Sequence, residues 1–230
     1  MEDKNIPNHI GFIIDGNRRW AKERGKTSFF GHKQGMENVS KIIKLCIKKS
    51  IKYVSVYAFS TENWNRNKKE VNYLMKLFAI FAKKHLNEFH KLGVRVQING
   101  QFEKLPKFLQ KTLKKAIEKT KNNKEMVIQI CLSYGGRTEV IDAIKKIVKK
   151  GIDYKNITED LIAKNLYSAE VPDPDFIVRT SGEHRLSNFM TWQGVYSELY
   201  FPKCHWPAFD KTELEKALKE FAKRQRRFGR

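Results

Sequence analysis

Short apolar runs alternate along this chain with longer segments in which apolar residues recur every three or four positions. The short runs are rich in β-branched and aromatic residues, as buried strands are, and they occupy residues 9–14, 53–59, 94–100, 126–134 and 175–180. The periodic segments are helix candidates and cover residues 32–49, 68–91, 106–120, 137–150, 158–166 and 211–226. This alternation predicts an α/β fold with a central, mostly parallel sheet of about six strands, flanked by helices on both faces.

The chain shows no sign of a division into separate domains. Its 230 residues can form one sizeable core, and the sequence has no internal repeat, low-complexity linker or shift in composition. The segment VPDPD at 171–175 is typical of a rigid turn that leads into the last predicted strand. We therefore expect a single domain over residues 1–230.

The sequence does not indicate a secreted or membrane-spanning protein. No apolar run approaches the roughly 18 residues that cross a bilayer, and the N-terminus lacks the pattern of a signal peptide. The three cysteines, Cys46, Cys131 and Cys204, are far apart and have no metal-binding spacing. We expect a soluble cytoplasmic protein with reduced thiols, which can still touch the inner face of the membrane.

Basic residues strongly outnumber acidic ones, with 46 Lys+Arg against 25 Asp+Glu and a formal net charge of +21. Such an excess suits a polyanionic partner, whether nucleic acid, an anionic membrane surface or a phosphorylated substrate. Most of the excess is lysine, however, and lysine on the outer side of helices is commonly a solvated surface. Both interpretations are open at this point.

The end of the first predicted strand carries the first candidate site. The apolar run HIGFII passes directly into the turn DGN and then into RRWAKERG, which begins a short helix. Ligands bind at the carboxyl ends of the strands in open parallel sheets, so Asp15 stands where a ligand is expected. The amides from Gly16 onward face the start of a helix, where phosphate groups bind. Asp and Asn are also common turn and cap residues, so DGN alone does not decide between the two roles.

Two other predicted strands end in similar polar segments. STENWNRN at 60–67 follows the second strand, and SGEHRLSNF at 181–189 follows the fifth. Arginine binds phosphate in a bidentate way, and the arginines at these three strand ends are Arg19, Arg66, Arg179 and Arg185. Surface ion pairs would not explain why all four follow strands, so we predict an anion site. The phosphate loops GxxxxGK[ST] and GxGxxG are missing, and YGGR at 134–137 fits a tight turn as well as a phosphate contact.

The predicted helix at 71–85, VNYLMKLFAIFAKKH, is apolar nearly all the way round. A helix of this kind is usually fully buried or lies in a subunit interface. The functional alternative is that one of its faces lines a long apolar tunnel beside the charged site. A diphosphate with a hydrocarbon tail would use both environments.

Seven segments together resemble the signature regions of a known enzyme family. They are HIGFIIDGNRRWA, FGHKQG, YAFSTENWNR, YGGR, IVRTSGEHRLSNF, ELYF and WPAFD. In this order and spacing they resemble the cis-prenyltransferases, and are most similar to the bacterial undecaprenyl diphosphate synthases. The resemblance runs from His9 to the closing RRFG, which is nearly the whole chain.

The resemblance implies an enzyme. Cis-prenyltransferases join isopentenyl diphosphate to an allylic diphosphate such as farnesyl diphosphate, with cis double bonds, and repeat the step until a polyprenyl diphosphate is complete. The bacterial product is undecaprenyl diphosphate, the carrier lipid for cell-wall glycan synthesis. The resemblance also implies Mg²⁺ as the cofactor, a homodimer, delivery of the product to the membrane, and no nucleic-acid partner.

The same resemblance assigns site residues to the positions that match the family's motifs. Asp15 would bind the Mg²⁺, with His184 and Glu198 near the metal and Glu198 reaching across the dimer interface. The residues implied for the allylic diphosphate are Gly16, Asn17, Arg18, Arg19 and His32, with Trp20 beside them. Those implied for isopentenyl diphosphate are Arg179, Arg185, Leu186 and Ser187.

Removal of the final proton is implied at the end of the second strand. The residues there are Ser60, Thr61, Glu62, Asn63, Trp64 and Arg66. Asn63 is the usual catalytic candidate, but an amide is a weak base, so it would act through the substrate diphosphate or a water molecule. Alternatively, Asn63 forms an Asx turn before Trp64.

Two positions depart from the family's pattern. The pattern reads DGNGRWA and has an arginine four residues before the histidine of FGH, whereas here Arg18 stands in place of the glycine and Ser28 in place of the arginine. We expect Arg18 to turn toward the diphosphate and to supply the charge that Ser28 lacks. The alternatives are that Arg18 points to solvent, or that it is strained if the family's glycine needs a positive φ.

Two other functions fit parts of the sequence. A nucleic-acid-binding protein would explain the charge and would stack bases on its aromatic residues. Yet the basic residues are scattered over predicted helix surfaces such as KKIVKK at 145–150, and no known nucleic-acid motif is present. A non-catalytic accessory subunit would keep the fold and lose the reaction. The residues that favour the enzyme are Asp15, Asn63, Arg179, Arg185 and Glu198.

Overall fold

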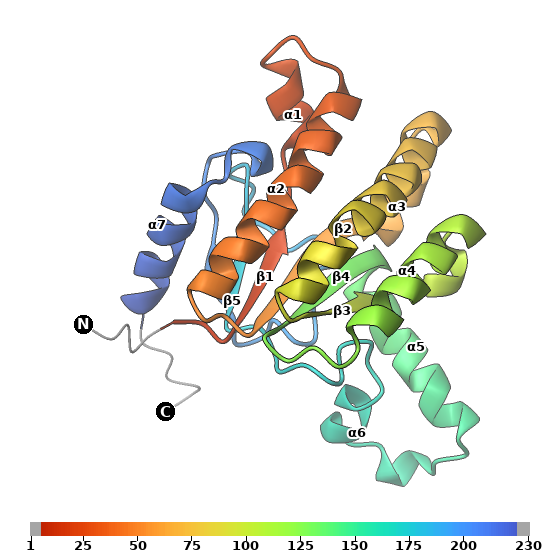
Figure 1. Cartoon of the computed structure of the whole chain (residues 1–230). Coiled ribbons are helices and arrows are strands. Elements are labelled where there is room, and N and C mark those ends of the chain that lie inside the picture. The colour runs from red at the N-terminus through yellow and green to blue at the C-terminus, as the bar shows by residue number, and fades with distance from the viewer. Residues whose placement is uncertain (1–5, 225–230) are drawn as a thin grey trace.

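The structure is a computed structural model and describes residues 6–224. Its centre is a six-stranded sheet in the order β3-β4-β2-β1-β5-β6, in which all neighbouring strands are parallel. The strands are β1 (His9–Ile13), β2 (Tyr53–Ser60), β3 (Val94–Asn99), β4 (Met126–Tyr134), β5 (Phe176–Arg179) and β6 (Glu198–Tyr200). The predicted parallel α/β sheet is therefore confirmed (Figure 1).

Five strands coincide with the predicted apolar runs to within one residue at either end, and β6 is the exception. It has three residues, all half-buried, and therefore shows neither an apolar run nor a clear alternation. Its position at the edge of the sheet depends on parallel pairing with β5, where Glu198 lies opposite Phe176. Such long-range pairing leaves no local pattern in so short a segment.

The helices agree with the periodic segments, with small shifts at their ends. They are α1 (Asn17–Lys22), α2 (Ser28–Lys48), α3 (Lys68–Lys91), α4 (Lys107–Thr120), α5 (Gly136–Lys149), α6 (Glu159–Ala163) and α7 (Lys211–Ala222). The short helix expected after DGN is α1. The last two residues of the predicted helix 211–226, and the closing RRFG, lie outside the described residues.

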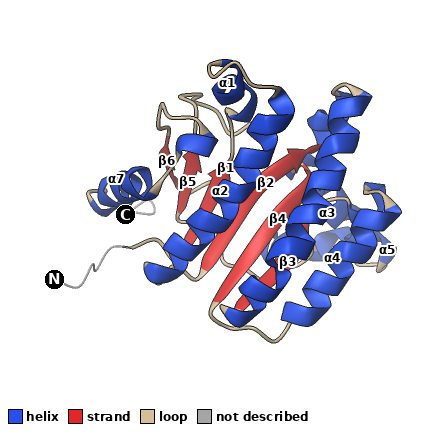
Figure 2. Cartoon of the chain, turned by 45° about the horizontal axis from the view of Figure 1, so that its top comes forward, coloured by secondary structure: helices blue, strands red, loops and turns tan. Residues whose placement is uncertain are grey.

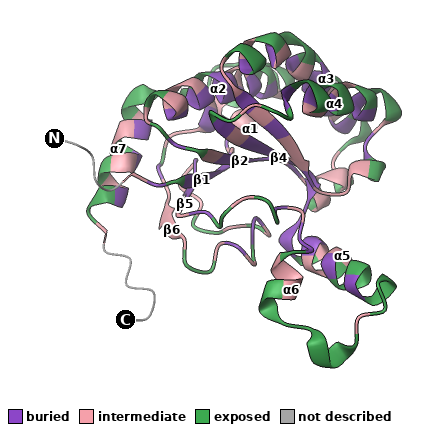
Figure 3. Cartoon of the chain, turned by 60° about the horizontal axis from the view of Figure 1, so that its bottom comes forward, coloured by how far each residue is buried: buried purple, intermediate pink, exposed green. Residues whose placement is uncertain are grey.

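Helices α7, α2, α3 and α4 form a layer that covers one face of the sheet (Figure 3). Their buried side chains form one large core with the strands, which includes Phe12 of β1, Ile43 of α2 and Phe78 of α3. The other face carries a smaller apolar cluster, where Phe189 and Met190 are fully buried. Helices α5 and α6 lie on this second side and project from the body of the molecule (Figures 1 and 3).

Helix α3 buries one face against the sheet and its neighbouring helices. Leu74, Met75 and Phe78 are each 5% exposed or less, while Ile80 on the outer side is 60% exposed. The near-continuous apolar character of this helix is thus explained by burial. An apolar tunnel along α3 stays a prediction, although Leu74 also reaches the cavity described below.

The sheet order determines where the polar segments meet. Strands β2, β1 and β5 are neighbours and parallel, so the segments that follow them leave the sheet at one edge. That edge carries α1 (Figures 1 and 2). No helix among residues 6–224 is long and apolar enough to cross a membrane.

Candidate active site

Asp15 lies at the carboxyl end of β1 and is fixed through both its backbone and its side chain. Its carbonyl oxygen accepts hydrogen bonds from Oγ1 of Thr180 at 2.7 Å and from the amide of Trp206 at 2.9 Å. Its Oδ1 accepts the amide of Gly16 at 2.6 Å, and its Oδ2 accepts Nη2 of Arg179 at 2.9 Å. Segments that are far apart in the sequence, around Arg179 and Trp206, therefore hold this residue in place.

The charge of Asp15 is stabilised by its basic neighbours. Burial alone would raise the pKa of this carboxyl group, but the hydrogen bond and charge of Arg179, together with the charge of Arg19, hold its pKa below the usual value. Nη2 of Arg19 lies 3.3 Å from Oδ1. Asp15 is therefore ionised at neutral pH.

Gly16 has a backbone conformation that favours glycine, with φ at 99°. A Cβ atom at this position would lie 1.9 Å from Oγ of Ser181 and 2.5 Å from Nδ1 of His205. The turn therefore depends on glycine for both its backbone angle and its close packing. Behind it, Oδ1 of Asn17 is buried without a hydrogen-bond partner among the described residues, and it packs against Gly35, where a Cβ would come within 2.2 Å.

Arg179 is the last residue of β5 and is 5% exposed. Its Nη1 donates to the carbonyl oxygen of Arg185 at 2.6 Å and to Oγ of Ser187 at 2.7 Å. The segment after β5 therefore folds back over the guanidinium. The side chain of Arg185 takes a different course, because its Nη1 lies 2.5 Å from Glu183, whose other oxygen is 2.7 Å from Nη1 of Arg19.

The segment after β2 forms a short 3₁₀ helix over Thr61–Asn65. Oδ1 of Asn63 accepts the amide of Ser60 at 3.2 Å, as part of a capping box. Asn63 therefore has a structural role, but as a cap on this turn and not in the Asx turn before Trp64 that was the predicted alternative. Nε1 of Trp64 donates to Oγ of Ser133 at 2.9 Å, and Glu62 accepts Nδ2 of Asn188 at 2.9 Å.

A second group of charges lies between α1, α2 and α3. Oε1 of Glu70 is 3.0 Å from Nε2 of His32 and 3.2 Å from Nη1 of Arg66, and Oε2 is 3.9 Å from Nη1 of Arg18. Burial lowers the pKa of His32, and the nearby arginines lower it further, while Glu70 opposes this change. Sequence analysis missed Glu70, although its position four residues after Arg66 is typical of a helical ion pair.

These groups surround one cavity of about 1030 Å³. Twelve of the residues that the sequence singles out line it: Asp15, Gly16, Asn17, Arg18, Arg19, His32, Ser60, Glu62, Asn63, Arg66, Arg179 and Ser187. The predicted convergence of three strand ends is therefore confirmed. Further lining residues that sequence reasoning missed are Lys22, Lys26, Tyr57 and Asn188. Lys22 could have been found from its position one helical turn after Arg18.

The remaining predicted site residues do not line the cavity within this chain. They are Trp20, Thr61, Trp64, His184, Arg185, Leu186 and Glu198. Trp20 stacks on Phe30 with ring centroids 6.0 Å apart, and His184 stacks on Phe201 at 4.8 Å. Glu198 starts β6, at the opposite end of the sheet from Asp15, and its Oε2 lies 2.8 Å from Nη1 of Arg224.

The donor set at Asp15 fits a magnesium ion. Mg²⁺ is commonly held by one or two carboxylates, with substrate phosphates and water completing its coordination. Asp15 supplies an ionised carboxylate at the cavity wall. Residues 6–224 of a single chain contain no group of three His, Cys, Asp or Glu side chains placed to hold a metal, so the roles of His184 and Glu198 stay predictions about a dimer.

Comparisons with known proteins agree with this geometry. The sequence matches the family described as "Putative undecaprenyl diphosphate synthase" over residues 13–229. An isoprenyl transferase of Clostridium tetani is 48% identical over 229 residues, which cover 98% of this chain and 90% of the relative. An isoprenyl transferase of Streptococcus pneumoniae is 46% identical over 97% of this chain and 92% of the relative.

Two solved structures have the same fold. Lavandulyl diphosphate synthase from Lavandula x intermedia, in complex with dimethylallyl diphosphate, matches with a TM-score of 0.95 and 34% identity, over 99% of this chain and all of that one. A probable undecaprenyl diphosphate synthase from Campylobacter jejuni matches with a TM-score of 0.83 and 31% identity, over 98% of this chain and 100% of that one. The chain therefore belongs to the undecaprenyl diphosphate synthase family, and it is a prenyltransferase of the cis type.

Proposed function

We propose that this enzyme condenses isopentenyl diphosphate with farnesyl diphosphate and repeats the addition to give a long polyprenyl diphosphate such as undecaprenyl diphosphate. The observation that carries the proposal is the joining of the three strand ends around one cavity, with arginines and an ionised Asp15 in its wall. The match to a structure that is described with dimethylallyl diphosphate supports an allylic substrate.

We propose that the cavity binds two diphosphates, one on each side of Asp15. On one side lie the turn at Gly16, Arg19, His32 and Arg18, which would bind the allylic diphosphate. On the other side Nη1 of Arg179 and Oγ of Ser187 are 2.7 Å apart, and both would contact isopentenyl diphosphate as donors matched to phosphate oxygens. Asp15 lies between the two groups.

The reaction breaks the bond between the allylic carbon and its diphosphate, forms a carbon–carbon bond to the isopentenyl unit, and releases a proton from that unit. Mg²⁺ held at Asp15 would neutralise negative charge on the departing diphosphate. Arg19 and the amides of the turn would stabilise the same charge. Oδ1 of Asn63 already accepts the amide of Ser60, and an amide is a weak base. Asn63 would therefore not take the proton itself. It would orient the group that does, which is either the substrate diphosphate or a water molecule.

A homodimer is part of this proposal. The projecting helix α5 exposes apolar side chains, with Ile141 52% and Val148 66% exposed, and Val195, shortly before β6, is 69% exposed. A second copy of the chain would cover these residues and could bring Glu198 to the neighbouring cavity. We also propose that the enzyme works in the cytoplasm at the inner face of the membrane, which receives the lipid product.

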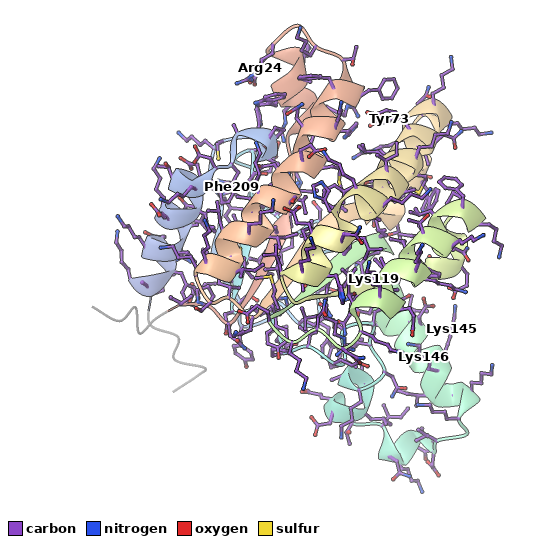
Figure 4. The ribbon with its side chains drawn as sticks, viewed as in Figure 1. Arg24, Tyr73, Lys119, Lys145, Lys146 and Phe209 are labelled. Carbon is purple, nitrogen blue, oxygen red and sulfur yellow. The ribbon has the colours of Figure 1, made fainter. Side chains whose placement is uncertain are left out.

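The alternative of nucleic-acid binding has less support. Lysines such as Lys119 on α4 and Lys145 and Lys146 on α5 are distributed over separate helices (Figure 4). The arginines that distinguish the sequence line the cavity instead. A non-catalytic accessory role is disfavoured because Asp15, Asn63 and Arg179 are present together in that cavity.

The test is incorporation of labelled isopentenyl diphosphate into butanol-extractable lipid with farnesyl diphosphate and Mg²⁺, followed by a mass spectrum of the product. A polyprenyl series that ends at one chain length is expected. Filter binding with generic RNA and DNA across salt concentrations is the comparison. Tight nucleic-acid binding without lipid synthesis would reject the proposal.

A further inference from the structure

Glu70 lies directly behind one wall of the cavity. It does not line the cavity, but it contacts three side chains that do, namely His32, Arg66 and Arg18. Its side chain is 13% exposed. One carboxylate therefore connects three basic groups that come from different parts of the chain.

The position of Glu70 joins three helices at the cavity. It belongs to the first turn of α3, where the helix dipole favours a negative charge. His32 comes from α2 and Arg18 from α1. Tyr73, one turn further along α3, donates its hydroxyl to the carbonyl oxygen of Phe29 in α2 at 3.1 Å (Figure 4). The start of α3 is thus held against α2 both by the hydrogen bond from His32 to Glu70 and by the one from Tyr73 to Phe29.

The hydrogen bond from His32 to Glu70 determines which ring nitrogen can serve a ligand. Burial would raise the pKa of Glu70, but His32, Arg66 and Arg18 outweigh it and keep that pKa below its usual value. The carboxylate is therefore ionised, and Nε2 of His32 must carry the hydrogen that it donates. Nδ1 is left to contact a phosphate oxygen, and it can donate only in the protonated imidazolium form, which the negative charge of Glu70 favours.

We propose that Glu70 is a positioning residue that holds His32, Arg66 and Arg18 from behind the wall so that they receive the allylic diphosphate. This inference rests on the proposed function. It predicts an effect on the allylic substrate alone, because Arg179 and Ser187, the proposed ligands of isopentenyl diphosphate, contact neither Glu70 nor its three partners in any of their hydrogen bonds.

The test compares Glu70→Ala and Glu70→Gln with a matched control, Glu88→Gln. Glu88 is on the same helix and also contacts a histidine and a cation, His85 and Lys44, but away from the cavity. Glu70→Ala should raise KM for farnesyl diphosphate about tenfold or more, with kcat and KM for isopentenyl diphosphate changed less than about threefold. Glu88→Gln should change none of these constants.

The pH dependence provides a readout that a purely structural role would not affect. The charged groups that face His32 are Glu70 on α3, Arg66 before α3 and Arg18 on α1. KM for farnesyl diphosphate should rise with pH as His32 loses its proton. Glu70 raises the pKa of His32, so in Glu70→Gln this rise should occur at lower pH. Glu70→Gln keeps an oxygen that can accept from His32, so its KM should lie between those of the wild type and Glu70→Ala.

Calorimetric titration with inorganic diphosphate separates this inference from the proposed function. Glu70→Ala should bind inorganic diphosphate more weakly than Glu88→Gln does. This result would support the inference even if the wild type made no lipid, and in that case only the proposed function would fail. The inference is overturned if loss of Glu70 tightens diphosphate binding, because Glu70 would then compete with the ligand. It is also overturned if both KM values change equally, if the pH profile is unmoved, or if Glu88→Gln has the same effect.

Discussion

Arg179 and Asp15 join the carboxyl ends of the neighbouring strands β5 and β1, with Nη2 of the arginine 2.9 Å from Oδ2 of the aspartate. The side chain of Arg179 is 5% exposed, so the pair is shielded from solvent on the side of the arginine. Arg179 also donates to the carbonyl oxygen of Arg185 and to Ser187. The pair therefore connects the proposed metal ligand to the proposed isopentenyl diphosphate site.

Replacing Asp15 by Ala should lower Mg²⁺-dependent turnover roughly a thousandfold or more, because the carboxylate would hold the ion that neutralises the leaving diphosphate. The fold should persist, with a loss of about 1–3 kcal/mol in the free energy of unfolding, because Arg179 keeps its bonds to Arg185 and Ser187. Turnover with saturating Mg²⁺ and urea unfolding are the measurements. Near wild-type turnover would refute the metal assignment.

Replacing Gly16 by Ala should damage the turn at the end of β1. The new Cβ would lie 1.9 Å from Oγ of Ser181, and the turn would have to shift, so KM for the allylic diphosphate should rise about tenfold. Gly151→Ala is the control, because Gly151 also has a positive φ of 68° but its Cβ would meet nothing within 4 Å. That variant should lose about 1 kcal/mol of stability and keep its KM. Equal effects on KM in both variants would contradict the steric argument.

His9 should make the free energy of unfolding depend on pH. It is fully buried between the carbonyl oxygen of Pro172 and Oγ of Ser55, and burial lowers its pKa from 6.5 to about 4. Between these two values the unfolded chain binds a proton that the folded chain does not. Stability from this group is therefore complete above pH 6.5 and falls as the pH decreases toward 4.

The loss from His9 at pH 5 should be about 2 kcal/mol relative to pH 7.5. Urea unfolding of the wild type and of His9→Gln at both pH values measures it, since the variant lacks the titrating ring. The variant should start less stable and lose less between the two pH values. Parallel losses in the two proteins would show that His9 does not titrate in this way.

Replacing Arg18 by Gly tests whether this residue compensates for Ser28. Both side chains line the cavity, and Arg18 lies within the helix α1, so the strain that a positive φ would bring does not arise. Arg18→Gly should raise KM for farnesyl diphosphate about tenfold, equivalent to about 1.4 kcal/mol. Adding Ser28→Arg should recover most of the loss. The side chain of Arg18 is 60% exposed. An unchanged KM in Arg18→Gly would mean that Arg18 is only a surface charge and does not bind the diphosphate.

Mixing two inactive variants tests the shared site. Asp15 and Glu198 lie at opposite ends of the sheet in one chain, so Glu198 could act at a metal only through a second copy. Subunits of Asp15→Ala and Glu198→Ala, exchanged under conditions shown to mix tagged chains, should form mixed dimers with one working site. Each mixed dimer should have up to about half of the activity of a wild-type dimer. If no activity returns after proven exchange, the shared site is wrong.

The sequence by itself determined the sheet and the edge at which the site lies. Strand and helix periods are local, so the five longer strands and the helices could be predicted from short windows. Parallel strands connected by helices place their carboxyl ends together, and this located Asp15, Arg66 and Arg179 at one edge. Motifs of consecutive residues then indicated diphosphate chemistry.

Only the tertiary structure decided which side chains face the cavity. Arg185 and Trp20 sit in the same motifs as Ser187 and Arg19, yet Arg185 pairs with Glu183 and Trp20 stacks on Phe30. Glu70 gained its role because α1, α2 and α3 meet there, and β6 formed because three residues pair with β5. Side-chain direction and edge pairing depend on contacts between residues far apart in the chain, and such contacts leave no period in the sequence.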